Sequence, residues 1–263
     1  MIKFFQKIRQ RLIAEGRFSK YLLYALGEII LVVIGILIAL QINNYNEQRK
    51  ARVTENIFYE DILLDLEKDD EKLDYYKHFC SKRIEYLDTL LTYVRNPQKT
   101  MGIEKFGKYV EPIFYSEQPN INDATFESAK SAGTFSAISD KTLLKDLSEY
   151  YSDFMLIKNN FNSLERFVEN QFEPIMYSLP EGYMDENTGD LVINQSDVTE
   201  FYKKIASVQD NRNITYNYQD VLNYPRMENY IIGDMGRTYN ALGKIEIRQQ
   251  KLKQLKQDIK NRD

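Results

Sequence analysis

One continuous apolar run, residues 21–42, constrains this chain more than any other feature of its sequence. It reads YLLYALGEIILVVIGILIALQI and contains a single charged residue, Glu28. A helix of this length measures roughly 33 Å at about 1.5 Å per residue, which is enough to cross the hydrocarbon core of a bilayer. The run therefore predicts one transmembrane helix.

The flanks of the run distinguish an anchor from a removable signal peptide. A cleavable signal has a shorter apolar region followed by a small-x-small site, whereas residues 41–45 are polar and bulky. Six basic residues precede the run and three follow it closely, a bias that keeps the N terminus in the cytoplasm. We predict an uncleaved signal anchor, a single pass through the inner membrane and a periplasmic C-terminal domain.

Several residues of the anchor have predicted roles. Tyr21 and Tyr24 at one end and Tyr45 at the other suit the two membrane interfaces. Glu28, Gly35 and Ala39 are separated by seven and four residues, so they share one helix face. One interpretation is a pairing face for a homo-oligomer, with Glu28 protonated or paired across it. The other is that Glu28 extends toward the cytoplasmic headgroups.

The charge distribution limits the class of partner. Residues 1–52 contain nine basic and three acidic residues, a net charge of +6, and the remainder contains 26 basic and 36 acidic residues, a net charge of −10. An acidic body argues against nucleic acid, which requires a concentrated basic surface. The basic end is expected to face anionic lipid, so its partner is the bilayer. The single cysteine, Cys80, excludes an internal disulfide framework.

Apolar residues beyond residue 42 recur at helical spacing and predict three long helices. They cover residues 54–96, then a stretch after a Ser139 or Asp140 cap, and a stretch from near Pro225 to the C terminus. One interpretation has the first of these helices continue almost directly from the span. The stripe of the second helix is Leu143, Leu147, Tyr150, Phe154, Ile157, Phe161, Leu164 and Val168. Shorter helices are expected at residues 103–115 and at 123–132, the latter ended by Gly133.

These elements predict a mainly α fold, in which one N-terminal transmembrane helix precedes a long-helix antiparallel bundle. We expect a basic cytoplasmic segment at 1–20, the span at 21–42, a juxtamembrane helical linker at 43–53 and one soluble domain at 54–263. Residues 174–224 are less regular and are expected to form a small insertion with a hairpin around the polar turn 185–190.

Residues suited to chemistry are few, and none is predicted to be catalytic. His78, the only histidine, lies two residues from Cys80, so the two side chains point in different directions on a helix; a surface histidine and a seam cysteine are expected. Asp61, Asp65 and Asp69 share a face that we interpret as solvated rather than as a cation site. Residues 185–190 lack the glycine position of a calcium loop.

No signature motif of an enzyme, a cofactor site or a metal site occurs in the sequence, and no cofactor is predicted. Among the 20 tyrosines, Tyr150, Tyr151, Tyr216, Tyr218 and Tyr224 are candidates for a binding face. The interpretation we favour places such aromatic residues in helix seams with their hydroxyls in water.

Two segments resemble one protein family. Residues 27–47, GEIILVVIGILIALQINNYNE, resemble the signature of the domain-of-unknown-function family 6090, which comprises small bacterial membrane proteins. Residues 125–133, TFESAKSAG, are similar to its TFESLKSSG-type motif. Tyr45 replaces the usual tryptophan and Ala129 the usual leucine. The resemblance implies an inner-membrane, Gram-negative setting and transfers no catalytic residue, ligand or partner.

The sequence thus favours a non-enzymatic membrane protein whose extracytoplasmic helical domain binds or scaffolds an envelope or membrane protein. One alternative is a sensory module that signals through a partner membrane protein, because about 20 cytoplasmic residues are too few for an output domain. A remote alternative is a carboxylate-based hydrolase.

Overall fold

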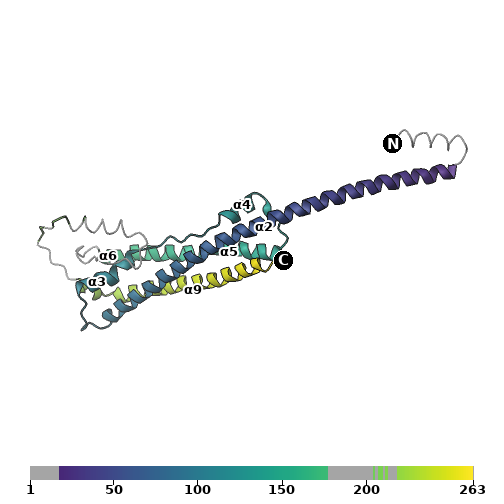
Figure 1. Ribbon diagram of the computed structural model, residues 1–263. Helices are drawn as coiled ribbons and strands as arrows, with labels where there is room; N and C mark the ends of the chain where they lie inside the picture. The colour runs from purple at the N-terminus through teal and green to yellow at the C-terminus, as the bar shows by residue number, and fades with distance from the viewer. Residues whose placement is uncertain (1–17, 177–203, 205–206, 210, 213–217, 263) are drawn as a thin grey trace. The chain divides into compact units, whose positions relative to one another are not determined.

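The computed structural model describes residues 18–176, 204, 207–209, 211–212 and 218–262. Within these residues every regular element is helical, and no strand is present (Figure 1). The predicted mainly α fold is confirmed. The polar turn at 185–190 and its expected hairpin lie outside the described residues.

Helix α2 (Phe18–Val94) is a single element of 77 residues. No proline interrupts it, because the first proline of the chain is Pro97. Proline disfavours the helical conformation of the residue before it, which is consistent with a helix that ends shortly before Pro97. The helix contains the whole apolar run and is long and apolar enough near its N terminus to cross a membrane. The expected helix at 54–96 therefore does continue directly from the apolar run.

The chain divides into two compact units, to both of which α2 contributes. The first contains Met1–Ile57 and Thr134–Ser139, and the second contains Phe58–Gly133 and Asp140–Asp263. In the first unit, the carboxylate of Glu55 is buried and accepts hydrogen bonds from the backbone nitrogen (2.8 Å) and the hydroxyl (2.9 Å) of Ser139. This contact holds the short segment Thr134–Ser139, which includes the 3-10 turn η2 (Thr134–Ser136), against α2.

The second unit is a bundle in which α2, α5 (Lys141–Phe167) and α9 (Met227–Lys260) lie side by side (Figure 1). Tyr150 contacts Asp69, and further along both helices Phe161 contacts Tyr76, so α5 runs parallel to α2. Helix α9 pairs Gln249 with Asp74 and Asp234 with Arg83, so it is antiparallel to both. The expected antiparallel relation thus holds for α9 and not for the α2–α5 pair.

A return segment makes the parallel pair possible. Between α2 and α5 the chain forms α3 (Ile103–Val110), the 3-10 turn η1 (Glu111–Phe114), an extended stretch and α4 (Ala124–Ser131). Helix α4 is followed by Gly133 with φ of 74°, the left-handed conformation that glycine adopts without strain. Helix α5 then begins after Asp140, whose side chain accepts a hydrogen bond from the backbone nitrogen of Leu143 at 2.9 Å.

The core follows the predicted apolar stripes. All eight stripe residues of the second helix are buried, the last of them, Val168, in the π-helical turn η3 (Val168–Phe172) that extends α5. A short helix, α6 (Glu173–Met176), follows η3, and α8 (Gln219–Leu222) precedes α9. These end elements join α3 and η1 around one apolar cluster that includes Phe106, Ile113, Phe172, Leu222 and Ile231.

Candidate functional site

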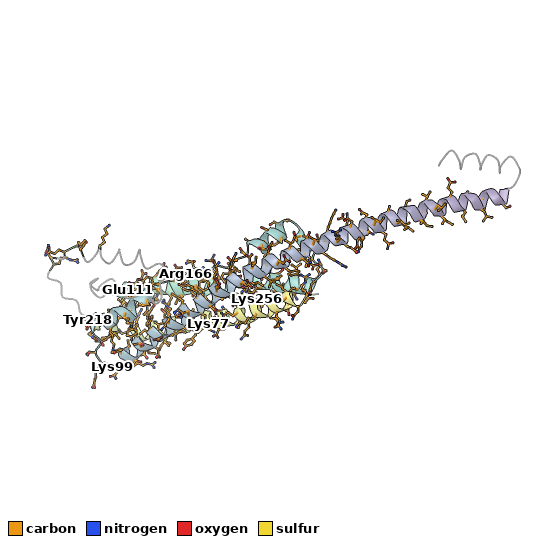
Figure 2. The ribbon with its side chains drawn as sticks, in the orientation of Figure 1. Lys77, Lys99, Glu111, Arg166, Tyr218 and Lys256 are labelled. Carbon is orange, nitrogen blue, oxygen red and sulfur yellow. The ribbon has the colours of Figure 1, made fainter. Side chains whose placement is uncertain are left out.

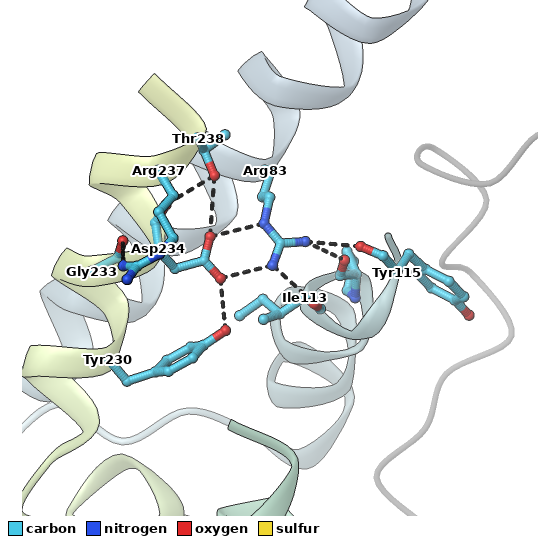
Figure 3. A network of polar contacts seen from close by, with 9 residues as sticks. Arg83, Ile113, Tyr115, Tyr230, Gly233, Asp234, Arg237 and Thr238 are labelled. Atoms are coloured by element: carbon cyan, nitrogen blue, oxygen red, sulfur yellow. Dashed lines mark hydrogen bonds and ion pairs between the residues drawn. The ribbon is translucent and has the colours of Figure 1, made fainter. Parts of the chain in front are cut away.

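One polar network of the bundle is centred on Arg83, which is fully buried; Figure 3 shows its contacts. Its Nε and Nη2 donate to the two carboxylate oxygens of Asp234 at 2.9 and 2.7 Å. The remaining N–H groups donate to the backbone oxygens of Pro112, Ile113 and Tyr115 at 3.0–3.4 Å. Burial alone would lower the pKa of Arg83, but the charge and hydrogen bonds of Asp234 outweigh it and raise that pKa.

The network is closed on itself. Tyr230 donates its hydroxyl to Asp234 at 2.7 Å, and the Thr238 hydroxyl lies 3.1 Å from the other carboxylate oxygen. All five N–H donors of the guanidinium are used, which is the full capacity of an arginine. The arrangement connects α2, α9 and η1. No N–H donor of Arg83 is left for a ligand, so we interpret the network as structural. This pair has no signal in the sequence, since the two charged residues lie 151 positions apart.

A second network overturns part of the interpretation of the acidic face on α2. Asp69 is fully buried, with Oδ1 accepting from the backbone and side-chain nitrogens of Asn122 (2.6 and 2.9 Å) and Oδ2 accepting from Tyr150 (3.2 Å). Burial raises the pKa of Asp69, and these hydrogen bonds oppose the shift. Asp61 is exposed and Asp65 half-buried. Asp69 is therefore not solvated but anchors the extended stretch before α4.

Two further buried polar groups have incomplete hydrogen bonding within the described residues. Glu111 accepts from the Tyr115 hydroxyl through Oε1 at 3.2 Å, while Oε2 has no hydrogen-bond partner, and burial raises the pKa of Glu111 to about 7. Arg248 stacks on the Tyr150 ring at 3.9 Å, although its Nε and Nη2 make no hydrogen bond there. Burial lowers the pKa of Arg248. The face of the Tyr150 ring attracts the guanidinium through a cation–π contact.

The histidine and the cysteine are separated as predicted. His78 is exposed, whereas Cys80 is fully buried in the core. Burial raises the pKa of the Cys80 thiol to about 12, so it carries no thiolate at neutral pH. The prediction of a surface histidine and a seam cysteine is confirmed.

The candidate tyrosines are divided between core and surface. Tyr150 and Tyr151 are buried, and Tyr150 donates to Asp69, so its hydroxyl is not in water. Tyr218 donates to the backbone oxygen of Met101 at 2.7 Å, and Tyr224 is exposed. Tyr216 lies outside the described residues. These tyrosines do not mark one common binding face.

The anchor residues all lie on α2. Glu28, Gly35 and Ala39 share one face, and a methyl group added at Gly35 would contact nothing within 4 Å. Tyr45 is exposed. The side chains of Tyr21 and Tyr24 are not among those that the structure describes.

The outward face of α9 is the surface feature that the sequence analysis did not identify. Ile232, Tyr239 and Ile247 are 47%, 56% and 67% exposed. Gly236 and Gly243 lie between them on the same face, because successive spacings of three or four residues follow the helical repeat. At both glycines an added methyl group would contact nothing within 4 Å. The signal for this face in the sequence is the pair of glycines inside a long predicted helix. Figure 2 shows the side chains of the bundle as sticks.

This face contrasts with the third glycine of α9. A methyl group on Gly233 would meet Cζ of Phe167 at 2.8 Å, so packing inside the bundle explains that glycine. No contact within the described residues explains Gly236 or Gly243, and glycine in a helix interior costs about 1 kcal/mol relative to alanine. An apolar face with two open glycines allows another backbone to approach closely. We name these five residues, 232, 236, 239, 243 and 247, the α9 face.

Comparison with known proteins identifies one family. A family model described as a family of unknown function, DUF6090, matches residues 28–200. Neither a curated protein nor a solved structure shows significant similarity to the chain. The matched region contains most of the first segment that suggested this family and all of the second. The chain therefore belongs to DUF6090, a family of unknown function.

Proposed function

We propose that this protein is a single-pass inner-membrane protein whose extracytoplasmic helical domain binds or scaffolds another protein of the envelope. The observation that carries the binding role is the α9 face, where exposed apolar side chains alternate with two open glycines. The closed networks around Arg83 and Asp69 support docking rather than catalysis, because their polar atoms are engaged within the bundle.

The membrane role is supported by α2. The same helix that contains the apolar run also supplies core residues of the bundle such as Ile62, Leu73 and Leu87. The excess of basic residues before the run supports a cytoplasmic N terminus. The net charge of −10 after residue 52 supports a protein partner over nucleic acid.

The α9 face suits a helix of the partner. A helix that crosses Gly236 and Gly243 can come close to the α9 backbone, and Ile232, Tyr239 and Ile247 then pack around it. Burying these apolar side chains supplies the favourable free energy of docking, roughly 25 cal/mol per Å² of apolar surface. Tyr239 is the expected anchor, because tyrosine is frequent among residues that dominate binding energy.

The test is cross-linking in intact cells followed by affinity purification of the full chain from membranes. Tyr239→Ala and Gly236→Leu should each lose the cross-linked partner. Leu156→Ala is the matched control, because Leu156 is an equally exposed apolar residue on α5, and it should retain the partner. Retention of the partner by Tyr239→Ala, or its loss from all three variants alike, would contradict the proposed docking face.

A further inference from the structure

The side of α2 that contains Glu28 continues well beyond the apolar run. At about 100° per residue in an ideal helix, six positions between residues 28 and 57 lie within about 20° of one line. We name them the α2 stripe: Glu28, Gly35, Ala39, Asn46, Val53 and Ile57. The chain's own segment Thr134–Ser139 is held by Glu55, which on the same ideal helix lies on the opposite side, about 180° away.

The composition of the α2 stripe is the reverse of what its surroundings require. Within the apolar run it has the only charged residue, Glu28, and two small residues, Gly35 and Ala39, where lipid favours large apolar side chains. Beyond the run it has Val53 and Ile57, which are 52% and 53% exposed. A polar and small face in lipid and an apolar face in water are both explained when another protein covers the stripe.

Lipid does not reach the distal part of the stripe. Val53 lies 11 residues after Ile42, a rise of roughly 16 Å at about 1.5 Å per residue. The headgroup region adds only about 5–8 Å to each side of the hydrocarbon core. Val53 and Ile57 therefore stand in water above the headgroups. This step depends on the membrane anchoring stated under the proposed function.

We propose that the α2 stripe is covered by the same stripe of a second copy of this chain, in a parallel, in-register pair. Copies of one chain insert with one orientation, so each stripe position meets its own twin at the same depth: Gly35 faces Gly35, and Val53 faces Val53. Such an interface is isologous, as in most two-fold dimers. The stripe follows the axis of a straight helix from Glu28 to Ile57, roughly 44 Å at about 1.5 Å per residue.

Asn46 accounts for the choice of two chains in register. A polar asparagine within a helix–helix interface favours the register that places it opposite its twin, where the two amides can hydrogen-bond to each other, as a buried asparagine does in parallel coiled coils. Asn46 lies on the line of the stripe between the small residues of the run and the apolar pair beyond it. The stripe thus combines close approach at Gly35 and Ala39, register at Asn46 and apolar burial at Val53 and Ile57.

Disulfide trapping in intact membranes tests the pair. In a full-length chain with Cys80→Ser, single cysteines are placed by Asn46→Cys on the stripe and Asn44→Cys as the matched control. Both positions are exposed asparagines, and Asn44 lies about 160° from the stripe in an ideal helix. After mild oxidation, Asn46→Cys should give at least tenfold more disulfide-linked dimer than Asn44→Cys.

A second pair of variants tests the apolar part. Adding Val53→Asp with Ile57→Asp to the Asn46→Cys chain should lower the dimer yield at least tenfold. Arg52→Asp changes the net charge by the same amount, lies away from the stripe and should leave the yield unchanged. Equal dimer yields for Asn46→Cys and Asn44→Cys, no dimer, or an adduct with a protein of different mass would overturn the pairing.

Extraction of the same membranes with alkali separates the two proposals. A chain that stays in the membrane but forms no dimer overturns the pairing alone and leaves the anchoring intact. A chain that alkali releases overturns the anchoring and the pairing together.

Discussion

At the scale of single residues, buried charged groups connect separate elements of this bundle. Arg83 connects α2 with α9 through Asp234 and with η1 through three backbone oxygens. Asp69 does the same for the extended stretch that precedes α4. Because an unpaired buried charge is costly, each network permits one alignment of its elements and penalises others.

Arg83→Met should lower the free energy of unfolding by about 3–5 kcal/mol, since it leaves Asp234 charged, buried and without its partner. Adding Asp234→Leu should recover part of that loss, because the uncompensated charge is then removed. Urea unfolding of the detergent-solubilised chain measures both. A single variant within about 1 kcal/mol of wild type would show that the pair does not stabilise the bundle.

Glu111 should make stability depend on pH. Its pKa is about 7 in the folded state and 4.5 ordinarily, so the folded state retains a proton that the unfolded state has lost. Stability is therefore greatest below pH 4.5 with respect to this group and falls as the pH rises to about 7, by about 3 kcal/mol in total. Glu111→Gln should be more stable than wild type at pH 8 by up to that amount.

Thermal unfolding at pH 5 and pH 8 checks the Glu111 prediction. The exposed residue Glu60 supplies the control, and Glu60→Gln should follow the wild-type pH dependence. An unchanged pH dependence in Glu111→Gln would show that this carboxyl group titrates near its ordinary pKa.

At the scale of elements, α9 has a buried face and an exposed face. Its inner face packs on α2 and α5 through Ile245, Leu252 and Leu255, all buried. Its outer face holds Gly236 and Gly243, which lower helix stability. At both positions an added Cβ atom would contact nothing within 4 Å among the described residues.

Gly236→Ala and Gly243→Ala should each raise the free energy of unfolding by about 1 kcal/mol, because alanine is the better helix former and its methyl group meets open space. Gly233→Ala should lower it, since the methyl group would overlap Phe167. Chemical unfolding of the three variants measures this contrast. Destabilisation by Gly236→Ala would show that its surroundings are already filled.

At the scale of the whole molecule, the chain combines a basic N-terminal end with an acidic remainder. The apolar run and core residues of the bundle belong to one helix, α2, with no proline before Pro97. The same helix therefore contributes residues to both compact units of the chain.

A reporter that is active only outside the cytoplasm, fused after Asp263, should be active in cells. The expected result follows from the six basic residues before the apolar run and the three after it. A reporter active only in the cytoplasm is the matched control and should be silent at the same position. The opposite pattern would reverse the orientation.

The sequence by itself determined the features that depend on local repeats. These were the apolar run, the mainly α fold, the buried stripe of α5, the Gly133 helix end and the family, because helical periodicity, capping and motifs act within a few residues. Only the tertiary structure decided that α5 runs parallel to α2, that Asp69 is buried, that Arg83 finds Asp234, and that Gly236 and Gly243 face outward. Those outcomes depend on which helix faces lie together, and contacts between residues 53 to 151 positions apart leave no periodic trace in the sequence.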